Sequence, residues 1–180
     1  MVDIRFQTLV FIYWQLNNMT TIIGDAKRKI IVSDSQYSDT DSSTKALDNE
    51  KVYRVPQGWL AGAGDVTSIQ EVVQYFKDGK KGKAPVIKDA DDADFMLLSE
   101  DGIFISGKDL RFSKVYTYDA LGSGTLAALA VMSLEHTAED ACWAACQSDM
   151  YSGGQVKVYS FDNRQPILYI KNTTNKNPAL

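Results

Sequence analysis

The sequence predicts an α+β fold in a single domain, with antiparallel strands in face-to-face sheets and helices outside them. Three short segments that are expected to form turns (25–28, 56–58 and 100–102) lie between apolar runs and indicate β-hairpins. Three further segments carry apolar residues at helical spacing. The chain has 180 residues, of which 44% are hydrophobic, so it can bury a core without disulfides or metals.

The first half of the chain is expected to contain two hairpins and one helix. The strands are predicted at residues 20–25, 29–34, 51–55 and 58–62. The segment 36–49 is rich in Ser, Thr and Asp, which indicates an exposed loop. Asp65 is a candidate N-cap for a helix over 65–76, and residues 77–93 indicate a loop.

The second half is expected to add strands on both sides of two helices. One helix is predicted over 125–136, and Thr137 is a candidate N-cap for the next, which runs to about residue 150. Glu139 and Asp140 fall in its first turn, where negative charge favours the helix dipole. The strands are predicted at residues 95–99, 103–106, 112–118, 155–161 and 166–171.

Charge and hydropathy argue against a nucleic-acid surface or a membrane segment. The net charge is -4, and the basic stretch 77–83 is short, interrupted by Gly and followed by the acidic run 89–94. No apolar run is long enough to cross a bilayer. We therefore expect neither nucleic acid nor a membrane among the partners, and a cytoplasmic location.

The sequence offers little for a metal, a cofactor or a histidine-based triad. Cys142 and Cys146 share a helix face, which is typical of small buried residues, and zinc would need two more ligands. His136 is the only histidine and lies at a helix end. The run 89–94 resembles a calcium loop but lacks the central Gly. No cofactor or metal is expected.

The pair Met19-Thr20 resembles the start of a mature protein inside a longer chain. A Thr that follows a removable Met can become an N-terminus, and its free α-amino group, with a pKa of about 8, then lies beside its own hydroxyl. Residues 1–19 contain a short apolar run but no basic segment before it, so they make a poor signal peptide. We interpret them as a leader that is removed or as a mis-assigned start.

Four local motifs together resemble one family. They are Thr20-Thr21-Ile22-Ile23, Ser33-Asp34-Ser35-Gln36, Glu50-Lys51-Val52 before Leu60-Ala61-Gly62, and Gly122-Ser123-Gly124 with Asp149-Met150-Tyr151-Ser152-Gly153-Gly154. Each is weak alone, but their order and spacing resemble proteasome β-subunits and the bacterial HslV-type peptidases. These are threonine peptidases of the N-terminal-nucleophile hydrolase superfamily. The resemblance covers residues 20 to about 161.

The resemblance implies a catalytic role for several residues. Thr20 matches the nucleophile, Lys51 matches the cation that favours its deprotonated form, and Asp34 matches the carboxylate paired with that lysine. Lys45 is a poorer candidate for the lysine. Gly62 matches the residue whose N–H forms the oxyanion hole.

The remaining matches lie around the nucleophile. Ser123, Asp149 and Ser152 match the residues that orient the terminal amine and its water. Gly122-Ser123-Gly124 lacks the Gly-Lys-Ser/Thr of a phosphate loop, so we reject that alternative. Leu60 matches a position that lines the pocket for the residue before the cleaved bond, which favours apolar residues there.

The implied fold is the four-layer αββα sandwich of the superfamily, in a domain over 20–172 followed by a polar tail over 173–180. The second helix of the first helical layer is expected to be reduced or missing, because residues 77–93 are too short and too rich in Gly and Asp. The Met before Thr20 follows the HslV pattern, whereas Asp149 to Gly154 is closer to the proteasome β version. We expect a divergent member, of the kind found in a bacterium or a phage.

The resemblance implies an endopeptidase that cleaves unfolded polypeptides or peptides, as a homo-oligomeric ring that an ATP-dependent unfoldase could serve. Two alternatives remain open. One is a non-catalytic structural or assembly protein on the same fold that keeps residues 1–19, and the other is a small-molecule amidase of the same superfamily. Each residue taken alone also has an ordinary structural role: Thr20 in a strand, Asp34 and Gly62 in turns, Lys51 at a strand edge.

Overall fold

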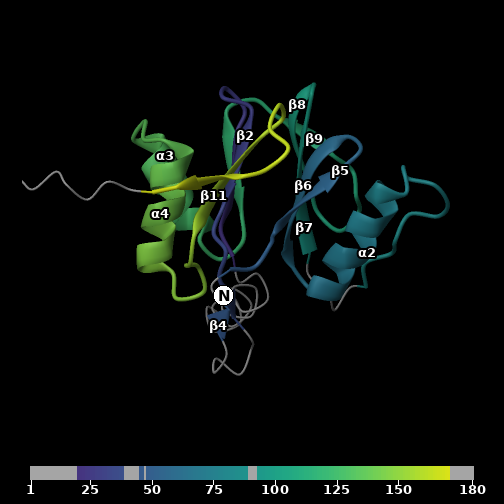
Figure 1. Ribbon diagram of the computed structural model, residues 1–180, viewed down its shortest axis with the longest axis horizontal. Coiled ribbons are helices and arrows are strands. Elements are labelled where there is room, and N and C mark those ends of the chain that lie inside the picture. The colour runs from purple at the N-terminus through teal and green to yellow at the C-terminus, as the bar shows by residue number, and fades with distance from the viewer. Residues whose placement is uncertain (1–19, 39–44, 47, 89–92, 171–180) are drawn as a thin grey trace, which may run out of the picture.

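Two antiparallel sheets form the centre of the molecule (Figure 1). The computed structural model describes residues 20–38, 45–46, 48–88 and 93–170. The first sheet has the order β10 (Tyr118–Leu121), β1 (Ile22–Asp25), β2 (Ile30–Ser33), β11 (Val156–Ser160) and β12 (Ile167–Tyr169). The second has the order β5 (Val52–Val55), β6 (Gly58–Gly64), β7 (Ala93–Ser99), β8 (Gly102–Ser106) and β9 (Ser113–Val115). A short ladder joins β3 (Tyr37–Ser38) to β4 (Lys45–Ala46).

Three helices among the described residues cover the outer faces of the sheets. In Figure 1, α2 (Val66–Lys77) lies on one side of the molecule, and α3 (Thr125–Ser133) and α4 (Ala138–Ser148) lie on the other. Both predicted N-caps are confirmed: Asp65 accepts a hydrogen bond from the Ser68 amide, and Thr137 accepts one from the Asp140 amide. The caps fix where α2 and α4 begin.

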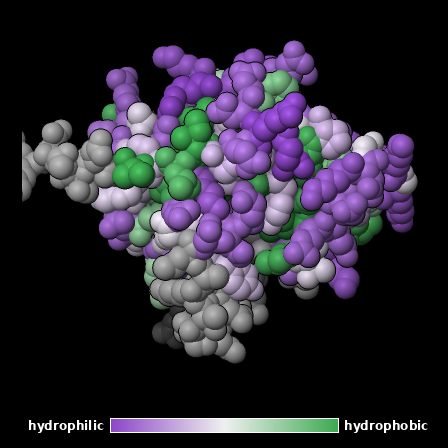
Figure 2. All heavy atoms as spheres, viewed as in Figure 1, coloured by the Kyte–Doolittle hydropathy of each residue, from purple (hydrophilic) through white to green (hydrophobic). Residues whose placement is uncertain are grey.

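Three apolar clusters hold the molecule together. One contains residues of both sheets, such as Ile22, Trp59 and Tyr159, and so fills the space between them. A second packs the first sheet against α3 and α4, and a third packs the second sheet against α2. The chain is therefore an α+β sandwich of two sheets with helices outside, as the sequence predicts. Most of the visible surface, including the part over α2, is hydrophilic (Figure 2).

The structure corrects one predicted strand. Residues 112–118 do not form a single strand, because β9 ends at Val115 in the second sheet and β10 begins at Tyr118 in the first. The chain crosses between the sheets there. Among the described residues, 78–88 form turns and bends and contain no helix. The leader over 1–19 and the tail over 173–180 lie outside the described residues.

No helix in the described part of the chain is both long and apolar enough to cross a membrane.

Candidate active site

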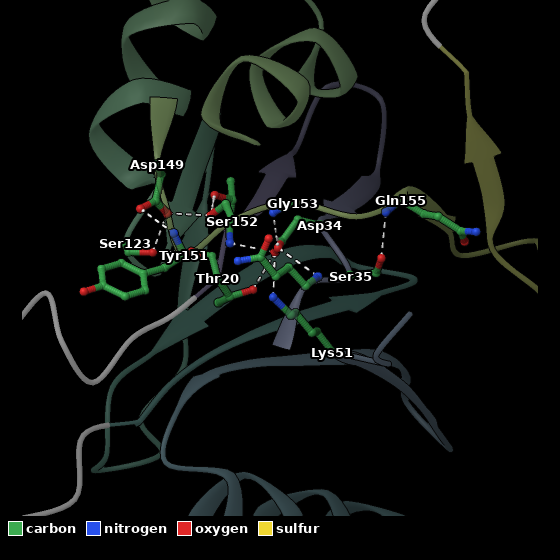
Figure 3. A network of polar contacts seen from close by, with 12 residues as sticks. Thr20, Asp34, Ser35, Lys51, Ser123, Asp149, Tyr151, Ser152, Gly153 and Gln155 are labelled. Carbon is green, nitrogen blue, oxygen red and sulfur yellow. Dashed lines mark hydrogen bonds and ion pairs between the residues drawn. The ribbon is translucent and has the colours of Figure 1, made fainter. Parts of the chain in front are cut away.

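The centre of the site is the Asp34 carboxylate, which is fully buried directly after β2 (Figure 3). Its Oδ1 accepts three hydrogen bonds: from Thr20 Oγ1 at 2.7 Å, from Lys51 Nζ at 2.8 Å and from the Thr21 amide at 2.9 Å. A buried carboxylate is costly unless donors surround it. One oxygen atom of Asp34 therefore binds both the hydroxyl of Thr20 and the ammonium group of Lys51, which the family resemblance implies to lie side by side.

The other oxygen of Asp34 is held by the backbone. Asp34 Oδ2 accepts from the Gly153 amide at 3.0 Å and from the Gln36 amide at 3.2 Å. A Cβ atom on Gly153 would lie 2.3 Å from Gln36 Oε1, so a larger residue at this position would have to displace the Gln36 side chain. These contacts fix the plane of the carboxylate and join β2 to the segment that leads into β11.

Lys51 reaches Asp34 from the other sheet. It lies directly before β5, and only 10% of its side chain is exposed. Burial lowers the pKa of Lys51, while the charge and the hydrogen bond of Asp34 act in the opposite direction. The lysine therefore loses its proton more readily than a solvated one, and it depends on Asp34 to stay charged.

A second polar cluster lies on the other side of Thr20, around Asp149. Asp149 Oδ2 accepts hydrogen bonds from Ser123 Oγ and Ser152 Oγ, each at 2.6 Å, and Asp149 Oδ1 accepts from the Tyr151 amide at 3.2 Å. Asp149 is the C-cap of α4. Its side chain gains hydroxyl and amide partners at a helix end where negative charge is otherwise disfavoured.

Thr20 and Thr21 connect the two clusters. The Thr20 carbonyl accepts from the Gly124 amide at 3.3 Å and lies 3.4 Å from Ser123 Oγ. Thr21 Oγ1 lies 2.7 Å from Ser152 Oγ, while the Thr21 amide donates to Asp34. A single two-residue segment thus joins the Asp34 cluster to the Asp149 cluster.

Two glycines allow this segment to pass close to the loop before α3. A Cβ atom on Gly122 would lie 2.1 Å from the Thr20 carbonyl oxygen, and the residue has a φ of +91°. A Cβ atom on Gly124 would lie 1.9 Å from Thr21 Oγ1. Both positions therefore require glycine for steric reasons, and the Gly-Ser-Gly motif serves to bring Ser123 beside Thr20.

Gly62 and Leu60 differ from the other predicted residues because the contacts described for them are backbone and packing contacts. The Gly62 amide donates to the Lys51 carbonyl at 3.2 Å, and a Cβ atom on Gly62 would lie 2.8 Å from Ile69 Cγ2 in α2. Glycine is thus required at position 62 for packing against the helix. Leu60 is fully buried in the core under α2. The oxyanion role of Gly62 and the pocket role of Leu60 stay predictions.

Six of the predicted site residues come together in the structure, namely Thr20, Asp34, Lys51, Ser123, Asp149 and Ser152. The side chain of the competing candidate Lys45 lies outside the described residues. Sequence reasoning gave no role to Thr21, or to the Gly153 amide. Both residues lie within motifs that the sequence analysis quotes, Thr20-Thr21 and Ser152-Gly153-Gly154. Their roles could not be recognised there, because no residue pattern marks a buried hydroxyl or a backbone amide that makes a long-range hydrogen bond.

Within the described residues, no group of three or more His, Cys, Asp or Glu side chains is placed to hold a metal ion. Cys142 is buried in α4, and its hydrogen bond with Cys146, together with burial, raises the pKa of its thiol. Such a thiol is a poor nucleophile and a poor ligand.

Comparison with known proteins finds likeness in the fold only. No protein-family model matches the sequence, and no curated protein matches it significantly. The structure of Thiobacillus denitrificans BPH in complex with epoxomicin matches with a TM-score of 0.62 and 19% identity, covering 80% of this chain and 100% of that one. Another structure of Thiobacillus denitrificans BPH gives a TM-score of 0.61 and 20% identity, covering 78% and 96%. This shared fold is consistent with the proteasome-like resemblance of the sequence motifs.

Proposed function

We propose that this protein is a threonine-type endopeptidase of the proteasome or HslV kind, with Thr20 as the nucleophile once residues 1–19 are removed. The observation that carries the proposal is the shared acceptor: Asp34 Oδ1 binds both Thr20 Oγ1 and Lys51 Nζ. This arrangement holds a positive charge close to the hydroxyl that has to lose its proton.

In the proposed reaction, cleavage before Thr20 turns its amide nitrogen into an amine beside its own hydroxyl. Thr20 Oγ attacks the carbonyl carbon of the substrate, and its proton passes to that amine, directly or through water. The tetrahedral intermediate expels the substrate amine, which takes up the proton, and leaves an ester on Oγ. Water then hydrolyses the ester and restores the threonine.

The Asp149 cluster would act on the amine of Thr20, whereas Asp34 and Lys51 act on its hydroxyl. Ser123 Oγ lies 3.4 Å from the Thr20 carbonyl and donates to Asp149 at 2.6 Å, so it belongs to a network that touches the nucleophilic residue. We propose that Ser123, Asp149 and Ser152 orient the Thr20 amine and its water. We propose that the Gly62 amide donates a hydrogen bond to the oxyanion, either in place of its bond to the Lys51 carbonyl or in addition to it.

The comparison adds independent support. One structure of similar fold is a complex of Thiobacillus denitrificans BPH with epoxomicin, a proteasome inhibitor. We therefore extend to this chain a fold-level expectation, the four-layer αββα sandwich of N-terminal-nucleophile hydrolases. We also propose a homo-oligomer.

The decisive experiment compares chains with and without residues 1–19. Intact mass and N-terminal sequencing show whether Thr20 becomes the N-terminus, and peptide hydrolysis is then measured for the wild type, Thr20→Ala and Thr20→Ser. We expect Thr20→Ala to abolish hydrolysis with the fold intact, and Thr20→Ser to keep some activity. Thr67→Ala, at an exposed threonine of α2, is the matched control.

Three results would contradict the proposal or redirect it. Full activity of Thr20→Ala would exclude Thr20 as the nucleophile. A chain that keeps residues 1–19 and does not react with a threonine-directed covalent inhibitor would favour the structural or assembly protein. Hydrolysis of small amides without hydrolysis of peptides would favour the amidase.

A further inference from the structure

The Lys51–Asp34 pair joins two different sheets. Asp34 directly follows β2 in the first sheet, and Lys51 directly precedes β5 in the second. The 2.8 Å contact between them therefore depends on how the two sheets lie at this edge. A lysine side chain has four rotatable bonds, so its ammonium group keeps a fixed position only if its backbone is held firmly.

The backbone around Lys51 is held by hydrogen bonds on three successive residues. The Asn49 amide donates to the Ser35 carbonyl at 2.8 Å, and the Lys51 carbonyl accepts from the Gly62 amide at 3.2 Å. Between them, the Glu50 carbonyl accepts from Tyr53 Oη at 2.8 Å. Ser35 belongs to the segment after β2, whereas Tyr53 lies in β5, so the contacts come from both sheets.

The side chain of Glu50 makes a further connection across the sheets. Glu50 Oε1 accepts from Tyr159 Oη at 2.6 Å, and Glu50 Oε2 lies 3.6 Å from Lys157 Nζ. Lys157 also binds Asp48 at 2.8 Å. The two partners of Glu50, Tyr159 and Lys157, lie in β11 of the first sheet, where Tyr159 is fully buried and Lys157 is 7% exposed.

At neutral pH the chemistry of these partners favours a hydrogen bond from Tyr159 to the Glu50 carboxylate. Burial, followed by the hydrogen bond to Glu50, raises the pKa of Tyr159. The tyrosine therefore remains a donor, and a charge-assisted bond of this kind is stronger than a neutral one. The ammonium group of Lys51 is paired with Asp34 at 2.8 Å, whereas the side chain of Glu50 is bound to Tyr159, so we expect Glu50 to act on Lys51 through the backbone.

We infer that Glu50 is a positioning residue: by binding Tyr159 across the sheets, it holds the backbone that aims Lys51 at Asp34. Its side chain binds Tyr159 and lies near Lys157, so its effect on the site would pass through Lys51. The inference rests on the proposed function for its catalytic consequence, but the restraint on Lys51 can be measured without any activity. Glu50 would thus contribute to the site by positioning Lys51, a role that differs from those of the polar groups around Thr20.

The test uses the full chain with four substitutions. Glu50→Ala removes the connection, Tyr159→Phe removes only the donor, and Glu50→Gln keeps an acceptor for Tyr159. Asp109→Asn is the control, because it alters an exposed ion pair with Arg111 away from the site. The first measurement is acylation of Lys51 by an amine-directed reagent, followed by mass spectrometry, with the exposed Lys77 as reference.

We expect the acylation of Lys51 to rise about threefold or more in Glu50→Ala and Tyr159→Phe, and to stay near wild type in Glu50→Gln and Asp109→Asn. In the form that begins at Thr20, kcat should fall at least about tenfold in the first two variants with KM within about twofold, since a displaced Lys51 affects the chemical step. Rescue by Glu50→Gln separates positioning from loss of charge.

The outcomes can be told apart. Unchanged acylation of Lys51 in both Glu50→Ala and Tyr159→Phe overturns the inference, whatever the activity. Increased acylation together with an inactive wild type contradicts the proposed function and leaves the restraint on Lys51 supported. A rise in acylation with no change in kcat removes the catalytic part of the inference. If Glu50→Ala does not fold, Tyr159→Phe decides by the same two measurements.

Discussion

Thr21 Oγ1 lies 2.7 Å from Ser152 Oγ, although 131 residues separate them in the chain. The direction of this bond follows from counting protons. A serine hydroxyl has one proton, and Ser152 donates it to Asp149 at 2.6 Å. Thr21 must therefore be the donor to Ser152. The Thr21 amide in turn donates to Asp34, so this fully buried residue links both carboxylates of the site.

Replacing Thr21 by Val should weaken both stability and activity. Val keeps the shape of Thr but leaves the Ser152 oxygen without its donor, and an unsatisfied buried acceptor costs about 1–3 kcal/mol. We expect a loss of that size in the free energy of unfolding, measured by urea denaturation, and a lower kcat. Thr21→Ser should restore most of both. If Thr21→Val and Thr21→Ser have the same free energy of unfolding and the same kcat, the Thr21 hydroxyl does not have this role.

The pH dependence of activity should reflect Lys51. Below its pKa the lysine is charged and favours the deprotonated hydroxyl of Thr20; as pH rises through that pKa, the charge is lost. Because burial lowers the pKa of Lys51 from 10.5, kcat/KM should begin to fall at a lower pH than an ordinary lysine would allow.

An NMR titration of the Lys51 side chain checks the assignment directly. Asp34 is the group that raises the pKa of Lys51 against the effect of burial. Asp34→Asn should therefore move the Lys51 titration further toward low pH, even if the variant is inactive. A titration that does not move, or that moves upward, contradicts the pairing of these two side chains.

Sequence patterns predicted the parts of this fold that depend on near neighbours. Asp65 and Thr137 cap their helices through amides three residues away, so the cap is visible in the local sequence. The strand over 112–118 was wrong because periodicity does not tell which sheet a strand joins. The bond between Thr21 and Ser152 was missed for the same reason, since its partner is set by packing between distant segments.

The candidate site was predictable because its motifs carry side chains with chemistry. Asp34 and Lys51 were paired through resemblance, and the structure places them 2.8 Å apart. The reason for glycine at position 62 was not predictable: the glycine is required by Ile69 of α2, a contact that no motif records. Backbone donors such as the Gly153 amide likewise leave no signal, because every residue except proline has one.

Stability at low pH should depend on the ion pair between Arg28 and Glu139, which joins the turn after β1 to the start of α4. Burial alone would raise the pKa of Glu139, but the hydrogen bonds and the charge of Arg28, together with a backbone hydrogen bond, outweigh burial, and the pKa is lowered. A carboxyl group with a lowered pKa in the folded state stabilises the fold above its unfolded pKa of about 4.3 and loses that effect as pH falls.

Glu139→Gln should therefore lower the free energy of unfolding near pH 7 by about 0.5–1 kcal/mol, a modest amount because the Arg28 side chain is 44% exposed. The difference from wild type should shrink as pH drops below about 4. Urea denaturation at several pH values measures it, with the exposed Glu135→Gln as control. A difference that is constant with pH would mean that the ionised carboxylate is not the stabilising form.

A double-mutant cycle at Gly124 and Thr21 tests the close packing that brings the two threonines to the site. A Cβ atom on Gly124 would lie 1.9 Å from Thr21 Oγ1 and 3.0 Å from the Ala145 Cβ. Gly124→Ala should lower the free energy of unfolding by about 1–3 kcal/mol, as overpacking does. Thr21→Ala should cost about 1–3 kcal/mol through its lost hydrogen bond.

The two losses should not add. Thr21→Ala removes the atom that the new methyl group would strike, so the double variant should be more stable than the sum predicts by about 1 kcal/mol or more. Gly107→Ala is the control, since its nearest contact would be an ordinary 3.5 Å from Asp94 Oδ1. Additive losses, measured by urea denaturation of all four proteins, would show that Gly124 is not required by the path of Thr21.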